Sequence, residues 1–293
     1  MKKTGLVKWM KKSLLLACGG AFLLVGCGNE STETDDTDKA STSTYNIEVV
    51  TEGGKVLEDI GVFVYTDESQ KELEAAGETD DDGIFSYEAE KSTNCVVVLK
   101  DVPRGYQVED YYAIKGEDTK IVLQAQLLSL DEIADVTFKL GDVFVDLSVE
   151  AVDGNVYKIS QLLEEKQAVI LNFWYLNCGP CKTEFPFLQE SYEKHKDILE
   201  VLALNPVDGT KETVAQFQEE NQLTFPMAAC DAGWEKKMSL SAYPTTIVID
   251  RYGTIAFMHS GSITETAVFD QIFEYFTADN YKQVAVRNLK DLK

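Results

Sequence analysis

The chain has 293 residues, of which 44% are apolar and 10% aromatic, enough to build the cores of two domains. Its formal charge of −23 argues against a nucleic-acid partner, because phosphates are neutralised by clustered Lys and Arg. His195 and His259 lie far apart, and no run of His, Cys and carboxylates has the spacing of a metal site. We therefore expect no metal and no nucleic-acid partner.

The N-terminus predicts a secretory signal over residues 1–26. Several lysines precede an apolar run, 13–26, that is shorter than the roughly 20 residues needed to span a bilayer. The run ends in Leu24-Val25-Gly26-Cys27, which resembles the lipobox of bacterial lipoproteins. This resemblance implies cleavage before Cys27 and a lipid on that residue. An ordinary signal peptide, in which Cys27 is incidental, is the alternative.

Residues 27–44 predict a lipidated cysteine followed by a disordered tether. The stretch 28–44 is rich in Ser, Thr, Asp and Glu and contains no aromatic or branched aliphatic residue. Such a segment buries too little apolar surface to offset the entropy lost on ordering.

Residues 45–130 predict a small all-β sandwich, because short apolar runs alternate with turn residues. The turns include Asp80-Asp81-Asp82-Gly83 and Val102-Pro103-Arg104-Gly105. Together with a terminal Ile-Val-Leu strand, they resemble the B-type repeats of Gram-positive surface adhesins, which are prealbumin-like sandwiches. We expect a spacing or docking role for this domain. The expected strands are 45–50, 61–66, 83–89, 95–99 and 120–127.

Residues 138–279 predict an α/β domain, followed by a C-terminal tail over 280–293. The continuous apolar run 168–174 is typical of a central strand that is covered on both faces. Strands and helices then alternate and end in a hairpin, which favours an α/β sheet. We expect helices over 182–195, 211–221 and 264–277, and strands over 199–204, 245–250 and 254–259.

The motif Cys178-Gly179-Pro180-Cys181 joins the central strand to a helix. The first helical turn has unpaired N–H groups and the positive end of the helix dipole, so it stabilises a thiolate and should lower the pKa of Cys178. Pro180 suits this turn because its missing N–H had no intrahelical partner. Cys178 is therefore the expected nucleophile and Cys181 the resolving thiol. Half of a zinc site and a purely structural disulfide are the alternatives.

The segment 138–279 resembles the thioredoxin fold, and more narrowly the membrane-anchored TlpA-like and ResA-like thiol–disulfide oxidoreductases. The resemblance rests on Trp174 with the cysteine motif, on Glu184-Phe185-Pro186, and on a hairpin formed by 144–149 and 156–159. It implies a cis-proline loop at Tyr243-Pro244-Thr245, facing the cysteines. The substrate-binding residues that it implies are Trp174, Gly179, Pro180, Tyr243, Pro244 and Thr245.

One departure from the thioredoxin pattern concerns the proton of the resolving thiol. Asn172 stands where thioredoxins carry a buried Asp, and an amide cannot take up a proton. In the TlpA-like branch the corresponding candidate is a Glu three residues after the second cysteine, which here is Glu184. Residues 181 and 184 share a helix face, so we predict that Glu184 deprotonates Cys181. The alternative is an ordinary carboxylate in a first helical turn.

Cys95 and Cys230 are predicted to be small buried apolar residues. The alternative is a disulfide between them, which an oxidising compartment would permit.

These observations predict an extracytoplasmic, lipid-anchored thiol–disulfide oxidoreductase with no cofactor besides its redox-active cysteine pair. Gly-Pro between the cysteines, as in cytoplasmic reductants, favours a reductase of protein disulfides. A reductase in an oxidising compartment requires an integral-membrane electron donor. The expected location is the outer face of the cytoplasmic membrane in a Gram-positive cell envelope. The alternatives are a disulfide donor for secreted proteins and a redox-silent surface-binding lipoprotein.

Overall fold

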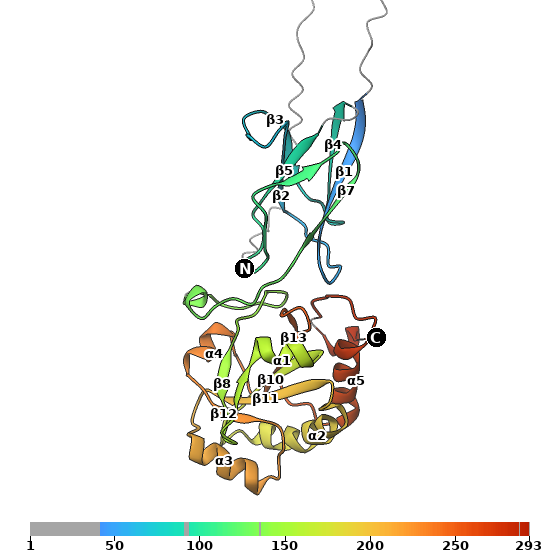
Figure 1. Ribbon diagram of the computed structural model, residues 1–293. Coiled ribbons are helices and arrows are strands. Elements are labelled where there is room, and N and C mark those ends of the chain that lie inside the picture. Colours follow the sequence, from blue (N-terminus) through green and yellow to red (C-terminus); the bar gives the residue numbers. More distant parts are fainter. Residues whose placement is uncertain (1–41, 91–93, 135, 287, 293) are drawn as a thin grey trace, which may run out of the picture. The chain divides into compact units, whose positions relative to one another are not determined.

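The computed structural model describes residues 42–90, 94–134, 136–286 and 288–292 (Figure 1). The predicted signal, 1–26, the lipidation site Cys27 and most of the tether lie outside these ranges. Within them, no helix has both the length and the apolar character needed to cross a membrane.

The first part of the described chain forms two β-sheets. One sheet has the strand order β4-β1-β7 and the other β3-β2-β5-β6. β1 pairs antiparallel with β4 but parallel with β7. The strands are β1 (Thr42–Thr51), β2 (Gly61–Tyr65), β3 (Leu73–Glu78), β4 (Ile84–Glu90), β5 (Cys95–Lys100), β6 (Tyr112–Ile114) and β7 (Thr119–Leu123).

Alternate residues of these strands face a shared core, which confirms the predicted β-sandwich. Tyr45, Ile47 and Val49 of β1 are buried in one cluster with Val62 of β2 and Val97 of β5, which come from the other sheet. This is the pattern of two sheets that pack face to face.

Three details of the sandwich differ from the sequence prediction. β3 was not predicted because its sequence, Leu-Glu-Ala-Ala-Gly-Glu, has no apolar alternation and it lies at a sheet edge. β6, also an edge strand, has three residues, too few to give a pattern. β1 begins at Thr42, so the last residues of the predicted tether, 42–44, belong to the strand and pair with β4.

The second part of the described chain has a five-stranded sheet with the order β12-β11-β10-β13-β14. The central strand, β10, pairs parallel with β11 and antiparallel with β13. A separate hairpin, β8 with β9, precedes it. The elements are η1 (Asp131–Ile133), β8 (Ser148–Glu150), β9 (Val156–Lys158), α1 (Ile159–Glu165), β10 (Ala168–Phe173), α2 (Gly179–His195), β11 (Leu199–Asn205), α3 (Lys211–Glu220), β12 (Met227–Ala229), α4 (Gly233–Lys237), β13 (Thr245–Asp250), β14 (Ile255–Ser260), α5 (Thr266–Thr277) and η2 (Leu289–Asp291).

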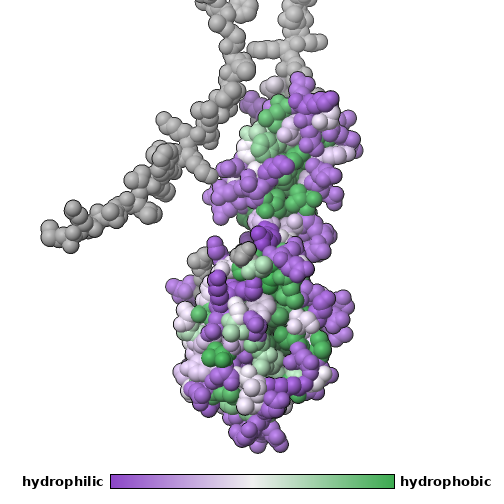
Figure 2. Space-filling model, turned by 90° about the vertical axis from the view of Figure 1, so that its left-hand side faces the viewer, coloured by the Kyte–Doolittle hydropathy of each residue, from purple (hydrophilic) through white to green (hydrophobic). Residues whose placement is uncertain are grey.

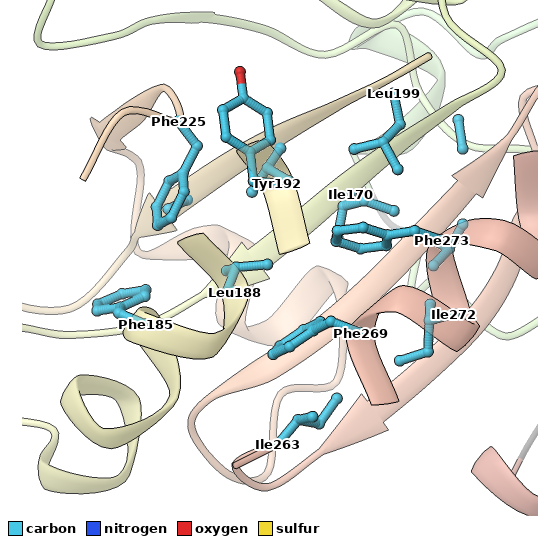
Figure 3. Close-up of a cluster of buried hydrophobic side chains, with 14 of the residues drawn as sticks. Ile170, Phe185, Leu188, Tyr192, Leu199, Phe225, Ile263, Phe269, Ile272 and Phe273 are labelled. Atoms are coloured by element: carbon cyan, nitrogen blue, oxygen red, sulfur yellow. The ribbon is translucent and has the colours of Figure 1, made fainter. Parts of the chain in front are cut away.

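Each face of this sheet is covered by its own apolar layer. On one face, Ala168 and Ile170 of β10 pack in a cluster with residues of α2, α3 and α5, part of which Figure 3 shows. On the other face, Val169, Leu171 and Phe173 pack against α1, α4 and the segment 128–147. Successive side chains of β10 point to opposite faces of the sheet, and both faces are covered. Its sequence is therefore apolar at nearly every position.

The layered architecture confirms the predicted thioredoxin fold, with a β-rich region before it. The core of the C-terminal domain is wider than the predicted bounds 138–279. Leu128 and Ile133 lie in it on one side, and Tyr281 and Leu292 of the predicted tail on the other. These apolar residues are separated by polar ones, so they give no clear period in the sequence.

Figure 2 shows one face of the molecule, on which green apolar residues lie among purple hydrophilic ones. Among the described residues, the large apolar side chains with the greatest exposure include Val56, Leu73, Leu130, Val156 and Val207. They come from different segments of the chain, and single exposed apolar residues of this kind are normal on protein surfaces.

Candidate active site around the cysteine pair

The cysteine pair lies at the junction of β10 and α2. Cys178 is the N-cap of α2, and its Sγ accepts a hydrogen bond from the backbone N–H of Cys181 (3.1 Å). Pro180 occupies the first turn, as its missing N–H allows. The Cys181 amide therefore points towards the sulfur of Cys178, where it would help to stabilise a thiolate.

Cys178 and Cys181 form a disulfide, with their Cα atoms 5.3 Å apart. Both cysteines are fully buried, while Asn177, Gly179 and Pro180 around them are exposed. The pair can take up or release two electrons by thiol–disulfide exchange. Gly179 and Pro180 have the exposure that their predicted contact with substrate requires.

Glu184 lies one turn after Cys181 and is fully buried. Its Oε1 accepts a hydrogen bond from the Asn172 side-chain amide (2.8 Å), and its Oε2 accepts one from the Ile263 backbone N–H (2.7 Å). Burial raises the pKa of Glu184 to about 7, although these two hydrogen bonds oppose the rise. A carboxyl group with such a pKa can exchange protons near neutral pH.

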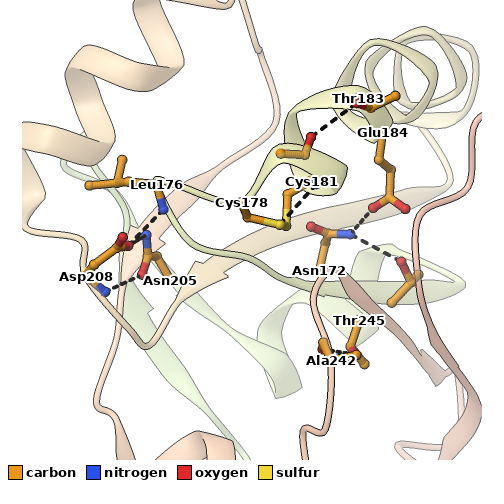
Figure 4. Close-up of a disulfide and its surroundings, with 12 residues drawn as sticks. Asn172, Leu176, Cys178, Cys181, Thr183, Glu184, Asn205, Asp208, Ala242 and Thr245 are labelled. Atoms are coloured by element: carbon orange, nitrogen blue, oxygen red, sulfur yellow. Dashed lines mark hydrogen bonds between the residues drawn. A yellow bond between two sulfur atoms is a disulfide. The ribbon is translucent and has the colours of Figure 1, made fainter.

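Asn172 lies on β10 beneath the first turn of α2 (Figure 4). Its Nδ2 donates to Glu184 and also to Oγ1 of Thr246 on β13 (3.2 Å). Its Oδ1 is buried and has no hydrogen-bond partner within the described residues. The sequence singled out Asn172 as a departure from thioredoxins, but it gave no indication of Thr246 or Ile263.

A second loop holds the segment that leads into Cys178. Oδ1 of Asp208 accepts a hydrogen bond from the backbone N–H of Leu176 (2.8 Å) and one from Nδ2 of Asn205 (3.1 Å), as Figure 4 shows. Oδ1 of Asn205 in turn accepts N–H groups from its own loop, the pattern of an Asx turn. Sequence reasoning missed both residues, although Asn-Pro-Val-Asp-Gly directly after a strand is a recognisable turn signal.

The predicted proline loop contains a cis peptide bond between Tyr243 and Pro244. The Tyr243 ring is partly exposed and contacts the ring of Tyr175 edge-to-face, with centroids 5.3 Å apart. Pro244 and Thr245 are buried, and the Thr245 hydroxyl donates to the Ala242 carbonyl (2.8 Å). Any contact between substrate and Thr245 would therefore involve its backbone, whereas Tyr175 is an additional candidate that the sequence analysis did not name.

Trp174 is in the core, in contrast to its predicted role in substrate binding. The side chain has no exposed surface and packs against Phe185 and Phe217, with ring centroids 5.3 Å and 4.6 Å away. Trp174 packs in the same buried cluster as Cys178 and Cys181, so it helps to hold the cysteine motif in place.

The other two described cysteines do not form a disulfide with each other. Cys95 is buried in the sandwich, and its Sγ donates to Glu74 (2.9 Å). Cys230 is partly buried near the proline loop, and burial raises the pKa of its thiol to about 12. Within the described ranges, no three His, Cys, Asp or Glu residues are grouped as a metal ion would require.

Comparison with known proteins finds relatives of the same chemistry. A model of the AhpC/TSA family matches residues 140–258. The chain is 35% identical over 133 residues to the thiol-disulfide oxidoreductase ResA of Oceanobacillus iheyensis. The matched stretch covers 43% of this chain and 68% of that protein. The ResA of Halalkalibacterium halodurans is 31% identical, over 44% of this chain and 73% of that protein. Among solved structures, StoA from Bacillus subtilis is 26% identical, with a TM-score of 0.38 over 43% of this chain and 96% of its own.

Proposed function

This chain belongs to the ResA-type thiol–disulfide oxidoreductases, and we propose that it reduces protein disulfides on the outer face of the cytoplasmic membrane. The observation that carries this proposal is the Cys178–Cys181 pair at the N-terminus of α2, with the buried Glu184 one turn further along. Such a pair exchanges electrons without any further cofactor.

The reaction begins with attack by the Cys178 thiolate on a substrate disulfide. An S–S bond forms between Cys178 and one substrate sulfur, and the other substrate sulfur leaves as a thiolate. Cys181 then attacks Cys178, which closes the Cys178–Cys181 disulfide and releases the second substrate sulfur. The enzyme dithiol is thereby oxidised by two electrons, and the substrate disulfide is reduced to two thiols. Exposed backbone around Gly179 and the partly exposed Tyr243 would hold the substrate peptide.

Glu184 takes up the proton that Cys181 loses in the second step. The carboxyl group is buried within one helical turn of Cys181, and burial raises its pKa to about 7, close to the pH at which it would work. The role of a merely structural carboxylate at a helix start fits less well, because such a group is normally exposed to water.

The direction of electron flow is tested by the reduction potential of the Cys178–Cys181 pair. We expect a value near or below that of thioredoxin, about −270 mV. Such a potential would require a membrane-embedded thiol donor to keep the pair reduced. The measurement is equilibration of the chain with thiol redox buffers, followed by trapping of free thiols. A value close to about −120 mV would instead indicate a disulfide donor. A pair that never exchanges would favour a redox-silent binding protein.

The proposed anchor is a lipid on Cys27, from which residues 28–44 extend. We expect the Cys27→Ser variant to lose a metabolically incorporated fatty-acid label, because serine lacks the thiol that carries the first lipid group. Cys18→Ser is the matched control, since Cys18 lies within the removed signal and should not affect labelling. Retention of the label in Cys27→Ser would contradict lipidation at this residue.

For the β-sandwich we propose a role in spacing the catalytic domain or docking substrates, which its resemblance to adhesin repeats suggests.

A further inference from the structure

The amide of Asn172 is held in one orientation by its neighbours. Its two Nδ2 hydrogens are directed to Oε1 of Glu184 (2.8 Å) and Oγ1 of Thr246 (3.2 Å). Oε1 of Glu184 accepts one of them, so the amide presents its nitrogen, not its oxygen, to this carboxyl group. The orientation of Oδ1 is thereby fixed as well.

Oδ1 of Asn172 is a buried acceptor that has no donor in the disulfide state. Buried carbonyl oxygens of side chains are nearly always hydrogen-bonded, so an exception requires a reason. Figure 4 shows the oxygen end of Asn172 on the side of the Cys178–Cys181 sulfurs, with the nitrogen end towards Glu184. A disulfide has no S–H group, so the oxidised pair cannot donate to this oxygen.

We propose that Oδ1 of Asn172 accepts a hydrogen bond from the S–H of Cys181 when the cysteine pair is reduced. Asn172 is then a positioning residue: its amide, oriented by Glu184, holds the Cys181 S–H in the reduced pair. The chain of contacts runs from the Cys181 S–H to Oδ1, and from Nδ2–H to Oε1 of Glu184. This inference rests on the proposed function, because it needs a dithiol state, but no bond is broken in forming the contact.

The carboxylate strengthens the contact by polarising the amide between them. A hydrogen bond from Nδ2 to a charged acceptor draws electron density towards Oδ1, which makes that oxygen a better acceptor. The disulfide state leaves Oδ1 unpaired, and reduction supplies its donor. The contact therefore stabilises the dithiol relative to the disulfide.

The direct test is the infrared S–H stretching band of Cys181 in the full chain carrying Cys178→Ala. The difference from the Cys178→Ala/Cys181→Ala chain isolates this band from those of the other cysteines. We expect the band at lower frequency with Asn172 than with Asn172→Leu, because a hydrogen bond weakens the S–H bond. Thr246→Val is the matched control: it removes another partner of the same amide and should leave the band in place. An unchanged band in Asn172→Leu, or in Asn172→Ala if the Leu variant does not fold, would overturn the proposal.

A redox equilibrium separates this contact from an effect on Glu184 alone. In the chain with both cysteines, Asn172→Leu should shift the equilibrium with glutathione about tenfold towards the disulfide, about 30 mV. A smaller shift in the same direction should remain in the Glu184→Gln background, because the contact then loses the polarisation by the carboxylate but keeps its S–H donor. A shift that vanishes in that background would mean that Asn172 only tunes Glu184, which would refute the proposal. Failure of the wild-type pair to exchange would refute the proposed function, whereas the infrared result would still stand.

Discussion

Replacement of Cys178 by Ser is expected to lower the rate of protein-disulfide reduction about a thousandfold or more. The substitution removes the sulfur at the N-cap of α2, and a serine hydroxyl does not ionise near neutral pH. The measurement is the initial rate of reduction of a disulfide-containing protein, with a small dithiol as electron donor. Cys230→Ser is the matched control, because burial raises the pKa of that thiol to about 12 and keeps it protonated.

The companion variant, Cys181→Ser, distinguishes the two cysteines. Cys178 can still attack, but nothing resolves the intermediate, so a covalent adduct between enzyme and substrate should accumulate and disappear on reduction. If Cys178→Ser kept most of its activity, or if Cys181→Ser formed no adduct, the assignment of nucleophile and resolving thiol would be wrong.

Replacement of Glu184 by Gln is expected to change how stability depends on pH. Burial raises the pKa of Glu184 to about 7 in the folded chain, above the value of 4.5 that applies without burial. The folded state therefore binds more protons than the unfolded state between these values, and stability falls as pH rises from about 4.5 to 7. The loss attributable to this carboxyl is about 3 kcal/mol. Glutamine does not ionise, so the variant should lack this loss.

The two pH profiles are compared by urea unfolding at pH 5 and pH 8, with the cysteines kept oxidised. The difference between wild type and variant isolates Glu184 from other buried carboxyl groups such as Asp250, whose pKa burial also raises. Glu190→Gln provides a control on the same helix, since its side chain is exposed and Thr266 and Lys194 lower its pKa. Parallel profiles for wild type and Glu184→Gln would show that Glu184 is ionised in the folded chain throughout this range.

The cysteine site was predictable because its determinants are contiguous in sequence. Cys178, Pro180 and Cys181 follow an unbroken apolar strand and precede a helix, and the structure has both elements there. The environment of Glu184 was not predictable. Its hydrogen-bond partners, Asn172 and Ile263, lie on β10 and in the loop before α5, and only the packing of the fold brings them together.

The burial of Trp174 was not predictable for a related reason. The motif shows that Trp174 lies close to the cysteines in sequence. It does not show whether the Trp174 ring points into the core or towards solvent. In the fold the ring turns into the layer beneath α2, against Phe217 of α3. The short elements β12 and α4 were missed because three and five residues carry too little periodicity.

The segment after α5 affects the order in which the C-terminal domain can be completed. The N–H of Val286 donates to the carbonyl of Ala256 in β14 (2.8 Å), the Tyr281 hydroxyl donates to the buried Asp250 (2.8 Å), and Leu292 is buried in the same layer as α5. In the proposed export, the chain crosses the membrane from its N-terminus onwards and folds on the far side. The sheet can therefore emerge and pair its strands while one flank of its core is still missing. Native packing of this domain must wait until residue 292 has crossed, whereas the β-sandwich can finish folding earlier.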